Sequence, residues 1–197
     1  MAIFNKLIEQ IDKNLPNDGK HTRDRGTAFE KMAVAYFKNE PAYKNKFSNV
    51  WMLSEVPAEY NIPRVDTGVG IVAKDRVSGK LKAIQAKFYK GKSGKGDIDS
   101  FVAEASKNYY ADGILITTTD DWNKHAENDL EGLSKPITRI GLSQLENADI
   151  DWQLFDFDSR NDNLRHKAKK MRDYQIEAVE KSVAYFKDHS RGKLVMA

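Results

Sequence analysis

Residues 62–89, IPRVDTGVGIVAKDRVSGKLKAIQAKFY, decide the fold. Apolar and polar side chains alternate through two segments of this stretch, and a polar turn that contains glycine joins them. Because successive side chains of a strand point to opposite faces, the alternation predicts a β-hairpin. We place its turn between Val77 and Ser78, so that residues paired across it have numbers that sum to about 155.

Each expected strand has one apolar face and one polar face. The apolar faces are formed by Ile84, Ala86 and Phe88 in the second strand and by Val65, Thr67, Val69, Ile71 and Ala73 in the first. The opposite faces carry Gln85, Lys87 and Tyr89 next to Asp66, Gly68 and Gly70. Side-chain oxygens can hold Mg²⁺ and an ammonium group can stabilise phosphate charge, so this face suits phosphodiester hydrolysis. Since Gln-x-Lys tripeptides are common, a merely solvated polar face is the alternative.

As a whole, the hairpin resembles the Mrr-like branch of the PD-(D/E)XK nucleases. That family reads roughly D-x-G-I-D, then a turn, then a hydrophobic residue and Q-x-K, and the segments 66–70 and 84–87 stand in those places. The resemblance implies a Mg²⁺-dependent DNA endonuclease in which Asp66 and Gln85 bind the metal and Lys87 is catalytic. Gly70 is a departure, because the family has its usual metal-binding aspartate at that position.

The expected pairing bears on this departure, because it sets Gly70 opposite Gln85 and Asp66 opposite Tyr89. Residues directly opposite lie about 5 Å apart, whereas four residues along a strand span about 13 Å. Asp66 is therefore too distant to replace the missing carboxylate unless a bulge shifts the register, and it remains the second candidate for that ligand. We expect weak or absent Mg²⁺ binding and little cleavage by this sequence.

Two further acids are candidates on the same resemblance. A helix from about Thr22 to Lys38 is expected to bury Phe29, Met32, Ala33, Tyr36 and Phe37, and Glu30 lies at the edge of that stripe. Nucleases of this family often place an acid on their first core helix, facing the hairpin. Glu55, near the end of a strand expected at Val50 to Val56, is a weaker candidate. An ordinary solvated glutamate is the alternative for both.

Composition sets broad limits on function. The net charge of +3 is too small to indicate nucleic-acid binding by itself, but the segment 80–96 contains six lysines and no acid. Its Gly-rich part does not have the spacing of a P-loop, so we interpret Lys90, Lys92 and Lys95 as contacts to a DNA backbone. The absence of cysteine excludes disulfides and thiolate metal sites. No signal peptide or long apolar run is recognisable, which favours a soluble cytoplasmic protein.

The remaining elements follow a helix, hairpin, helix, strand, helix, strand order. Helices are expected at 3–11, 99–110, 122–133 and 142–147, a buried central strand at 113–119 and a short strand at 137–140. Asp120 or Asp121 is expected to cap a helix. This order predicts an α/β fold with a mixed central sheet flanked by helices, which is the restriction-endonuclease-like core.

The C-terminal part differs in character. We expect a nuclease domain at 1–158, a basic helical linker at 159–170 and a third segment at 171–197. In that segment Ala178, Val179, Val183 and Phe186 have helical spacing, and Lys193 to Ala197 is expected to form a strand. That segment resembles the opening of a superfamily 2 helicase motor, in which an R-x-Y-Q element reads adenine, so Arg172, Tyr174 and Gln175 are candidates for ATP binding in a longer parent. The chain stops before any phosphate loop, which suggests a truncated RecA-like start without ATPase activity.

Together, the two resemblances are to single-polypeptide Type I-like (Type ISP) restriction-modification enzymes. They imply cleavage of double-stranded DNA without sequence reading, and a parent that adds a motor, a methyltransferase and a target-recognition domain. Two alternatives stay open. One is a nuclease fold that only binds DNA or acts as a scaffold, which Gly70 favours. The other is an RNA- or structure-specific nuclease that acts alone, which the motor-like tail disfavours.

Overall fold

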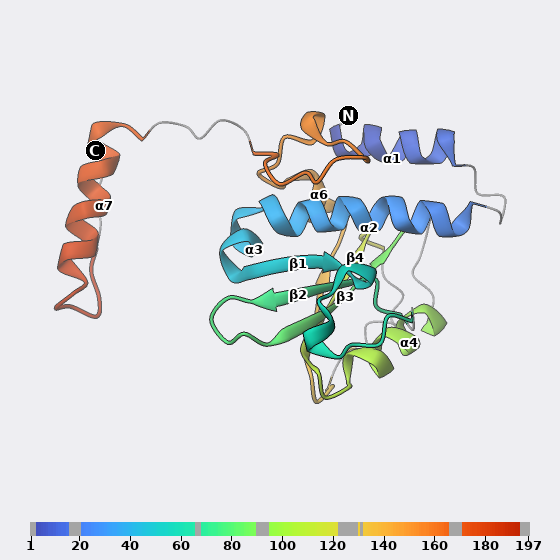
Figure 1. Ribbon diagram of the computed structural model, residues 1–197. Helices are drawn as coiled ribbons and strands as arrows, with labels where there is room; N and C mark the ends of the chain where they lie inside the picture. The colour runs from blue at the N-terminus through green and yellow to red at the C-terminus, as the bar shows by residue number, and fades with distance from the viewer. Residues whose placement is uncertain are drawn as a thin grey trace. The chain divides into compact units, whose positions relative to one another are not determined.

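The computed structural model describes residues 3–15, 21–65, 68–89, 95–121, 130, 132–165 and 171–193. The chain forms two compact units, Met1–His166 and Lys167–Ala197, and each is considered by itself. In its described residues the first unit has a five-stranded sheet of order β1-β2-β3-β4-β5 (Figure 1). The strands are β1 (Phe47–Met52), β2 (Ile71–Asp75), β3 (Leu81–Lys87), β4 (Tyr110–Thr117) and β5 (Ile137–Ile140). The first three are antiparallel neighbours and the last two join in parallel, which confirms the expected mixed sheet.

Helices cover both faces of this sheet (Figure 1). They are α1 (Ile3–Asn14), α2 (Thr22–Asn39), the short α3 (Pro41–Lys46), α4 (Lys95–Ala105) and α6 (Leu142–Glu146). The sequence did not indicate α3, which begins with a proline at its first position. The helix expected at 122–133 lies almost wholly outside the described residues.

The two faces of the sheet belong to two separate hydrophobic cores. On one face Ile71, Ile84 and Ala86 pack with Phe29 and Met32 of α2. The other core joins side chains of β2, β3 and β4 to α4, and its members include Val72, Ala83, Leu115, Ile98 and Phe101. The alternative, a merely solvated polar face, does not describe β3, because the middle strand of this sheet is covered on both sides.

The register of the hairpin is confirmed. Ile71 pairs with Ile84 and Lys74 with Leu81, and both pairs sum to the expected 155. The turn is held by the Asp75 carboxylate, which accepts hydrogen bonds from the backbone nitrogen of Ser78 at 2.8 Å and that of Val77 at 3.2 Å. The first of these bonds also contributes most to lowering the pKa of the Asp75 carboxyl.

The first hairpin strand is shorter than expected, since β2 begins only at Ile71. The expected inward face at Val65 is wrong, because that side chain is 70% exposed. Pro63 has no backbone N–H for a ladder, and Gly68 adopts a φ of 111°, so residues 61–65 and 68–70 do not continue the strand.

The boundaries of β1 also differ from the expectation. The strand covers Phe47–Met52, and a 3₁₀ turn at Leu53–Glu55 occupies the region assigned to its end. The Leu53 backbone nitrogen donates to the Gly70 carbonyl at 2.8 Å, so the chain leaves β1 beside the start of β2.

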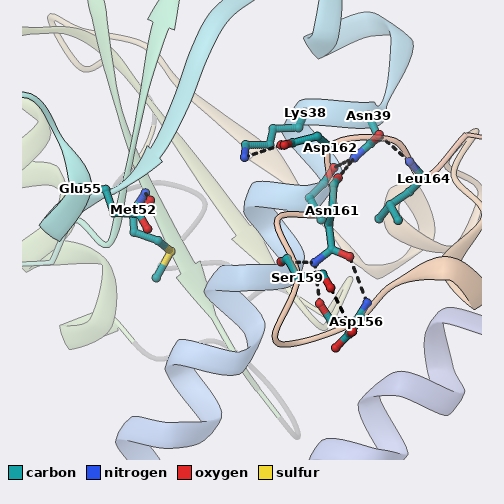
Figure 2. Close-up of polar contacts among 10 residues, drawn as sticks. Lys38, Asn39, Met52, Glu55, Asp156, Ser159, Asn161, Asp162 and Leu164 are labelled. Carbon is teal, nitrogen blue, oxygen red and sulfur yellow. Dashed lines mark hydrogen bonds and ion pairs between the residues drawn. The ribbon is translucent and has the colours of Figure 1, made fainter.

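Residues 156–164, called the strap below, fold over the C-terminal end of α2 (Figure 2). Asn161, with a φ of 51°, donates from its side chain to the carbonyls of Asp156 and Ser159. Asn39, fully buried at the end of α2, donates to the Asn161 carbonyl at 2.7 Å and accepts from the Leu164 nitrogen at 2.8 Å. These contacts attach the end of the first unit to α2.

The described part of the second unit contains α7 (Asp173–Tyr185), which confirms the helix expected there. Its apolar side chains Ile176, Val179, Val183 and Tyr185 are all exposed. Residues 194–197, expected to form a strand, lie outside the described residues. Over the described stretches, no helix combines the length and apolar character needed to cross a membrane.

Candidate functional site

Gln85 and Lys87 lie in β3, the middle strand of the sheet. Gln85 is 6% exposed, so its amide side chain is not on a merely solvated face. Lys87 is the last residue of the strand, is half-buried and pairs with Thr117 of β4. A rigid central strand thus carries both members of the Gln-x-Lys motif.

Gly70 is held next to this motif by its backbone. Its nitrogen donates to the Ile84 carbonyl at 3.2 Å, and its carbonyl accepts from the Leu53 nitrogen at 2.8 Å. Gly70 is therefore fixed between the end of β1 and the residue that precedes Gln85.

The Glu30 carboxylate reaches Gly70 from α2. A β-carbon placed on Gly70 would lie 1.9 Å from Glu30 Oε1 and 2.7 Å from its Cδ. Both distances are too short for neighbouring atoms, so the Glu30 carboxylate fills the space in which a side chain at position 70 would begin. The structure thus places the Glu30 carboxylate of α2 against the hairpin. The family resemblance implied an acid on the first core helix that faces the hairpin.

Gln85 Oε1 is a buried oxygen with no hydrogen-bond partner among the residues that the structure describes. Leaving such an atom unsatisfied costs about 1–3 kcal/mol, so buried amide oxygens are normally bonded. Amide and carboxylate oxygens are also the ligands that Mg²⁺ prefers. The Gln85 oxygen therefore fits a hard, oxygen-bound cation.

Other expected parts of the site cannot be placed. Asp66, Lys90 and Lys92 lie outside the described residues, and Lys95 begins α4 without a described side chain. Within the described stretches, no group of three or more His, Cys, Asp or Glu side chains could hold a metal ion.

Two residues near the site were not indicated by the sequence. The Thr118 hydroxyl accepts from the Tyr89 nitrogen and donates to the Tyr89 carbonyl, both at 2.8 Å. The Thr118 nitrogen also donates to the Lys87 carbonyl at 3.3 Å. The chain that follows Lys87 is thus tied to the end of β4. Thr118 belongs to a β-branched run that predicted only a strand.

Arg25 is the second such residue, and it connects α2 to the same end of β3. The guanidinium is almost fully buried, lies 4.5 Å from the centre of the Phe88 ring, and pairs with Asp12. It also donates to the Leu15 carbonyl at 2.6 Å. Phe88 in turn contacts Phe29 edge to face at 6.0 Å. These contacts fix α2, one turn before Glu30, against the residue after Lys87.

Glu55 is placed differently from the other acids. It is exposed and accepts from the Met52 nitrogen at 3.4 Å, at the end of the edge strand β1 (Figure 2). It lines a groove of about 810 Å³ that is bordered by β1, α2 and the strap. No contact in the described residues joins it to Gln85 or Lys87.

The aspartates after β4 have a structural role. Asp120 accepts from the Ser143 nitrogen at 3.0 Å and so caps the start of α6. One of the two was expected to cap a helix, although α6 lies further along the chain than the helix expected directly after them.

The candidates for ATP binding lie at the start of α7 in the second unit. The Arg172 nitrogen donates to the Gln175 side chain at 2.9 Å, and Tyr174 is 49% exposed. Gln175 therefore caps its own helix.

Comparisons with known proteins agree with this fold. A restriction endonuclease family model of the Mrr catalytic type matches residues 38–162, which is more than half of the chain. No curated protein matches. Among solved structures, the chain is similar to the ATP-dependent Type ISP restriction-modification enzyme LlaBIII bound to DNA, with 45% identity and a TM-score of 0.77. That likeness covers 100% of this chain and 12% of the enzyme's chain.

These matches confirm the restriction-endonuclease-like fold that the hairpin predicted, and the structural match extends over both units. The chain therefore belongs to the Mrr-type restriction endonuclease family.

Proposed function

We propose that the first unit is a Mg²⁺-dependent nuclease that cleaves double-stranded DNA without reading its sequence. The observation that carries this proposal is the buried, unbonded oxygen of Gln85, two residues before Lys87 on the central strand. An amide oxygen that lacks a partner in the described part of the chain, two residues before a lysine on the same strand, supports a Mg²⁺ site for phosphodiester cleavage.

Each residue has a distinct role in this proposal. Gln85 and Asp66 hold the metal, and the family's further metal-binding carboxylate, expected at position 70, is replaced by Gly70. The metal supplies charge neutralisation at the phosphate and a water of lowered pKa. Lys87 places its ammonium group beside the attacked phosphate and stabilises the negative charge that develops there.

DNA is the proposed substrate because the family acts on it and because the solved relative is described as bound to DNA. Lys90, Lys92 and Lys95 follow β3 directly and would contact the DNA backbone. Since such contacts carry no sequence information, specificity would come from other parts of a longer protein.

We further propose that the chain is the N-terminal part of an ATP-dependent restriction-modification enzyme in the cytoplasm. Domains would then lie at 1–158 and 171–197, with a linker at 159–170. Arg172, Tyr174 and Gln175 would contact ATP once a complete motor is present, and a methyltransferase and a target-recognition domain would complete the parent. The 12% coverage of the solved relative supports this arrangement.

The second candidate function is a nuclease fold that binds DNA without cutting it. Gly70 favours it, because the position lacks a carboxylate of its own and the described residues contain no group of three possible metal-binding acids.

A plasmid-nicking assay with Mg²⁺, run beside a DNA-binding assay without metal, separates the two functions. Mg²⁺-dependent nicking that Lys87→Ala abolishes supports the nuclease. Lys80→Ala is the matched control, because Lys80 is exposed in the hairpin turn, away from the site. DNA binding without nicking, even after Gly70→Asp, would support the binding domain instead.

A further inference from the structure

A buried arginine lies behind the strand that carries Lys87, and the proposed chemistry gives it no role. Arg25, near the start of α2, is only 4% exposed. Burial of a guanidinium is costly unless charged and polar groups surround it, so its partners show what holds it there. Those partners belong to two separate parts of the chain, the end of α1 and the residue that follows β3.

The end of α1 fixes one side of the guanidinium. Arg25 pairs with the Asp12 carboxylate and donates to the Leu15 carbonyl at 2.6 Å. The carbonyl groups at the end of a helix lack partners within it and attract a cation, and α1 ends at Asn14. The guanidinium is therefore held by the last turn of α1 and the residue just beyond it.

The other contact of the guanidinium is with Phe88. The central carbon of the guanidinium lies 4.5 Å from the centre of that ring, which is within the range of a cation–π contact. Phe29, four residues after Arg25 and so on the same side of α2, contacts the ring edge to face at 6.0 Å between the ring centres. Two side chains of one helix thus hold the residue that directly follows Lys87.

Thr118 of the neighbouring segment holds the same residues by their backbone. Its nitrogen donates to the Lys87 carbonyl at 3.3 Å, and its hydroxyl bonds the nitrogen and the carbonyl of Tyr89. Because β3 ends at Lys87, regular strand pairing does not fix the residues beyond it. Residues 87–89 are therefore held through their backbone on one side and through the Phe88 ring on the other.

We propose that Arg25 is a positioning residue for Lys87. Through the Phe88 ring it holds the end of β3 against α2, and so fixes the backbone from which the ammonium group of Lys87 extends. The inference rests on the proposed function, because that function makes Lys87 catalytic. It also gives α1 a part in the site, since Asp12 and the Leu15 carbonyl hold the guanidinium in place.

The first test is the kinetics of plasmid nicking with Mg²⁺, in the unmodified chain and in its Gly70→Asp variant. Arg25→Met keeps an unbranched side chain and loses the charge. We expect kcat to fall about tenfold or more while KM for DNA stays within about threefold, because a displaced Lys87 affects the reaction and not the binding of DNA. Arg25→Lys keeps a cation over the ring and a partner for Asp12, so its kcat should stay within about threefold of the parent.

Asn39→Ala is the matched control. Asn39 is fully buried on the same helix, and its side chain bonds the strap, away from residues 87–89. This variant should be less stable, yet its kcat should be unchanged at a temperature well below its unfolding. A loss of kcat equal to that of Arg25→Met would assign the effect to lower stability alone and overturn the inference.

A double-mutant cycle with Phe88→Leu tests whether Arg25 acts through the ring. Once Phe88 is replaced by leucine, Arg25→Met should change kcat by less than about threefold. The same loss in both backgrounds would show that Arg25 acts by another route and would overturn the inference. Should Arg25→Met fail to fold, Arg25→Gln takes its place in the cycle, because an amide can still donate to Asp12 or to the Leu15 carbonyl.

Hydrogen exchange gives a readout that does not depend on cleavage. In Arg25→Met the Tyr89 amide, which donates to Thr118, should exchange about tenfold faster, whereas the Leu53 amide, which donates to the Gly70 carbonyl, should keep its rate. Equal acceleration at both amides would mean general loosening and would overturn the inference. The proposed function fails differently: if only the Tyr89 amide responds and no variant nicks DNA, Arg25 still positions the end of β3, and the nuclease activity is what falls.

Discussion

The Thr118 hydroxyl accepts a hydrogen bond from the Tyr89 nitrogen and donates one to the Tyr89 carbonyl, each at 2.8 Å. This one side chain therefore links the residues that follow β3 and β4. Thr118→Val keeps the shape but leaves two backbone groups of Tyr89 without that partner. We expect a loss of about 2 kcal/mol in the free energy of unfolding, measured by urea denaturation. Thr118→Ser retains the hydroxyl and should lose less than half of this. Equal losses in the two variants would mean that packing of the methyl group, not the hydroxyl, stabilises this end.

Lys87→Ala should abolish nicking and leave the fold intact. The side chain is half-buried at the end of β3, whereas Ile84 and Ala86 form the core contacts of that strand. The measurement is plasmid nicking with Mg²⁺ next to thermal unfolding, with Lys80→Ala as control. A variant that no longer folds would make Lys87 a structural residue.

Gly70→Asp should increase Mg²⁺-dependent nicking. The substitution restores a carboxylate beside β3, and its steric cost is low because Glu30 can turn away. Adding Lys87→Ala to this variant should remove the gain. If the unmodified chain already cuts at the same rate, and Asp66→Ala removes that activity, then Asp66 is the essential ligand and position 70 is not.

Replacement of Lys90, Lys92 and Lys95 by Ala should weaken DNA binding and reduce its salt dependence. For duplex DNA, each phosphate that is no longer neutralised by a lysine lowers the slope of log K against log salt concentration by about 0.9. Fluorescence anisotropy with a DNA duplex over a range of salt concentrations measures the slope. An unchanged slope would place the DNA backbone on another surface.

Acid should loosen the strap. Hydrogen bonds from the Asp158 nitrogen, and then from the Ser159 hydroxyl, lower the pKa of the Asp156 carboxyl from its ordinary 3.8. A carboxyl whose folded-state pKa is lowered stabilises the fold above its unfolded pKa, and that contribution disappears as the pH falls through the folded value. We therefore expect hydrogen exchange at the Asp158 amide, which donates to this carboxylate, to lose protection below about pH 3.8.

The control for this prediction is Asp156→Asn, which keeps an oxygen acceptor and cannot titrate. Its Asp158 amide should show no such pH dependence. A pH dependence that survives the substitution would mean that another group causes the loss of protection.

The hairpin register was predictable because its determinants are local. The alternation of side chains and the turn from Asp75 to Gly79 lie within one short segment, and the carboxylate of Asp75 closes that turn as such residues usually do. The start of β2 was not predictable from alternation, since Pro63 and the φ of 111° at Gly68 end the pairing earlier than the pattern does.

The burial of Gln85 was not predictable from the hairpin, because it depends on elements that follow it. β4 pairs with β3 from residue 110 onward, and α4 covers the face that the pattern marked as polar. The approach of Glu30 to Gly70 likewise requires α2 to cross the sheet. The family resemblance suggested such an acid. The steric overlap between the Glu30 carboxylate and any side chain at position 70 could only be found from the structure.

The strap has a mechanical consequence. Asn39 holds the strap at one end of α2, and Glu30 lies nine residues earlier on the same helix, about 14 Å along its axis. Beyond Leu164, a pull on the chain would be shared by the Asn39 bond to the Leu164 nitrogen, the Asp151 bond to the Leu164 carbonyl and the Arg165–Asp149 ion pair. The helix that carries Glu30 is therefore one of the elements that would bear a load arriving from the C-terminal side, whereas none of these contacts involves Gln85 or Lys87.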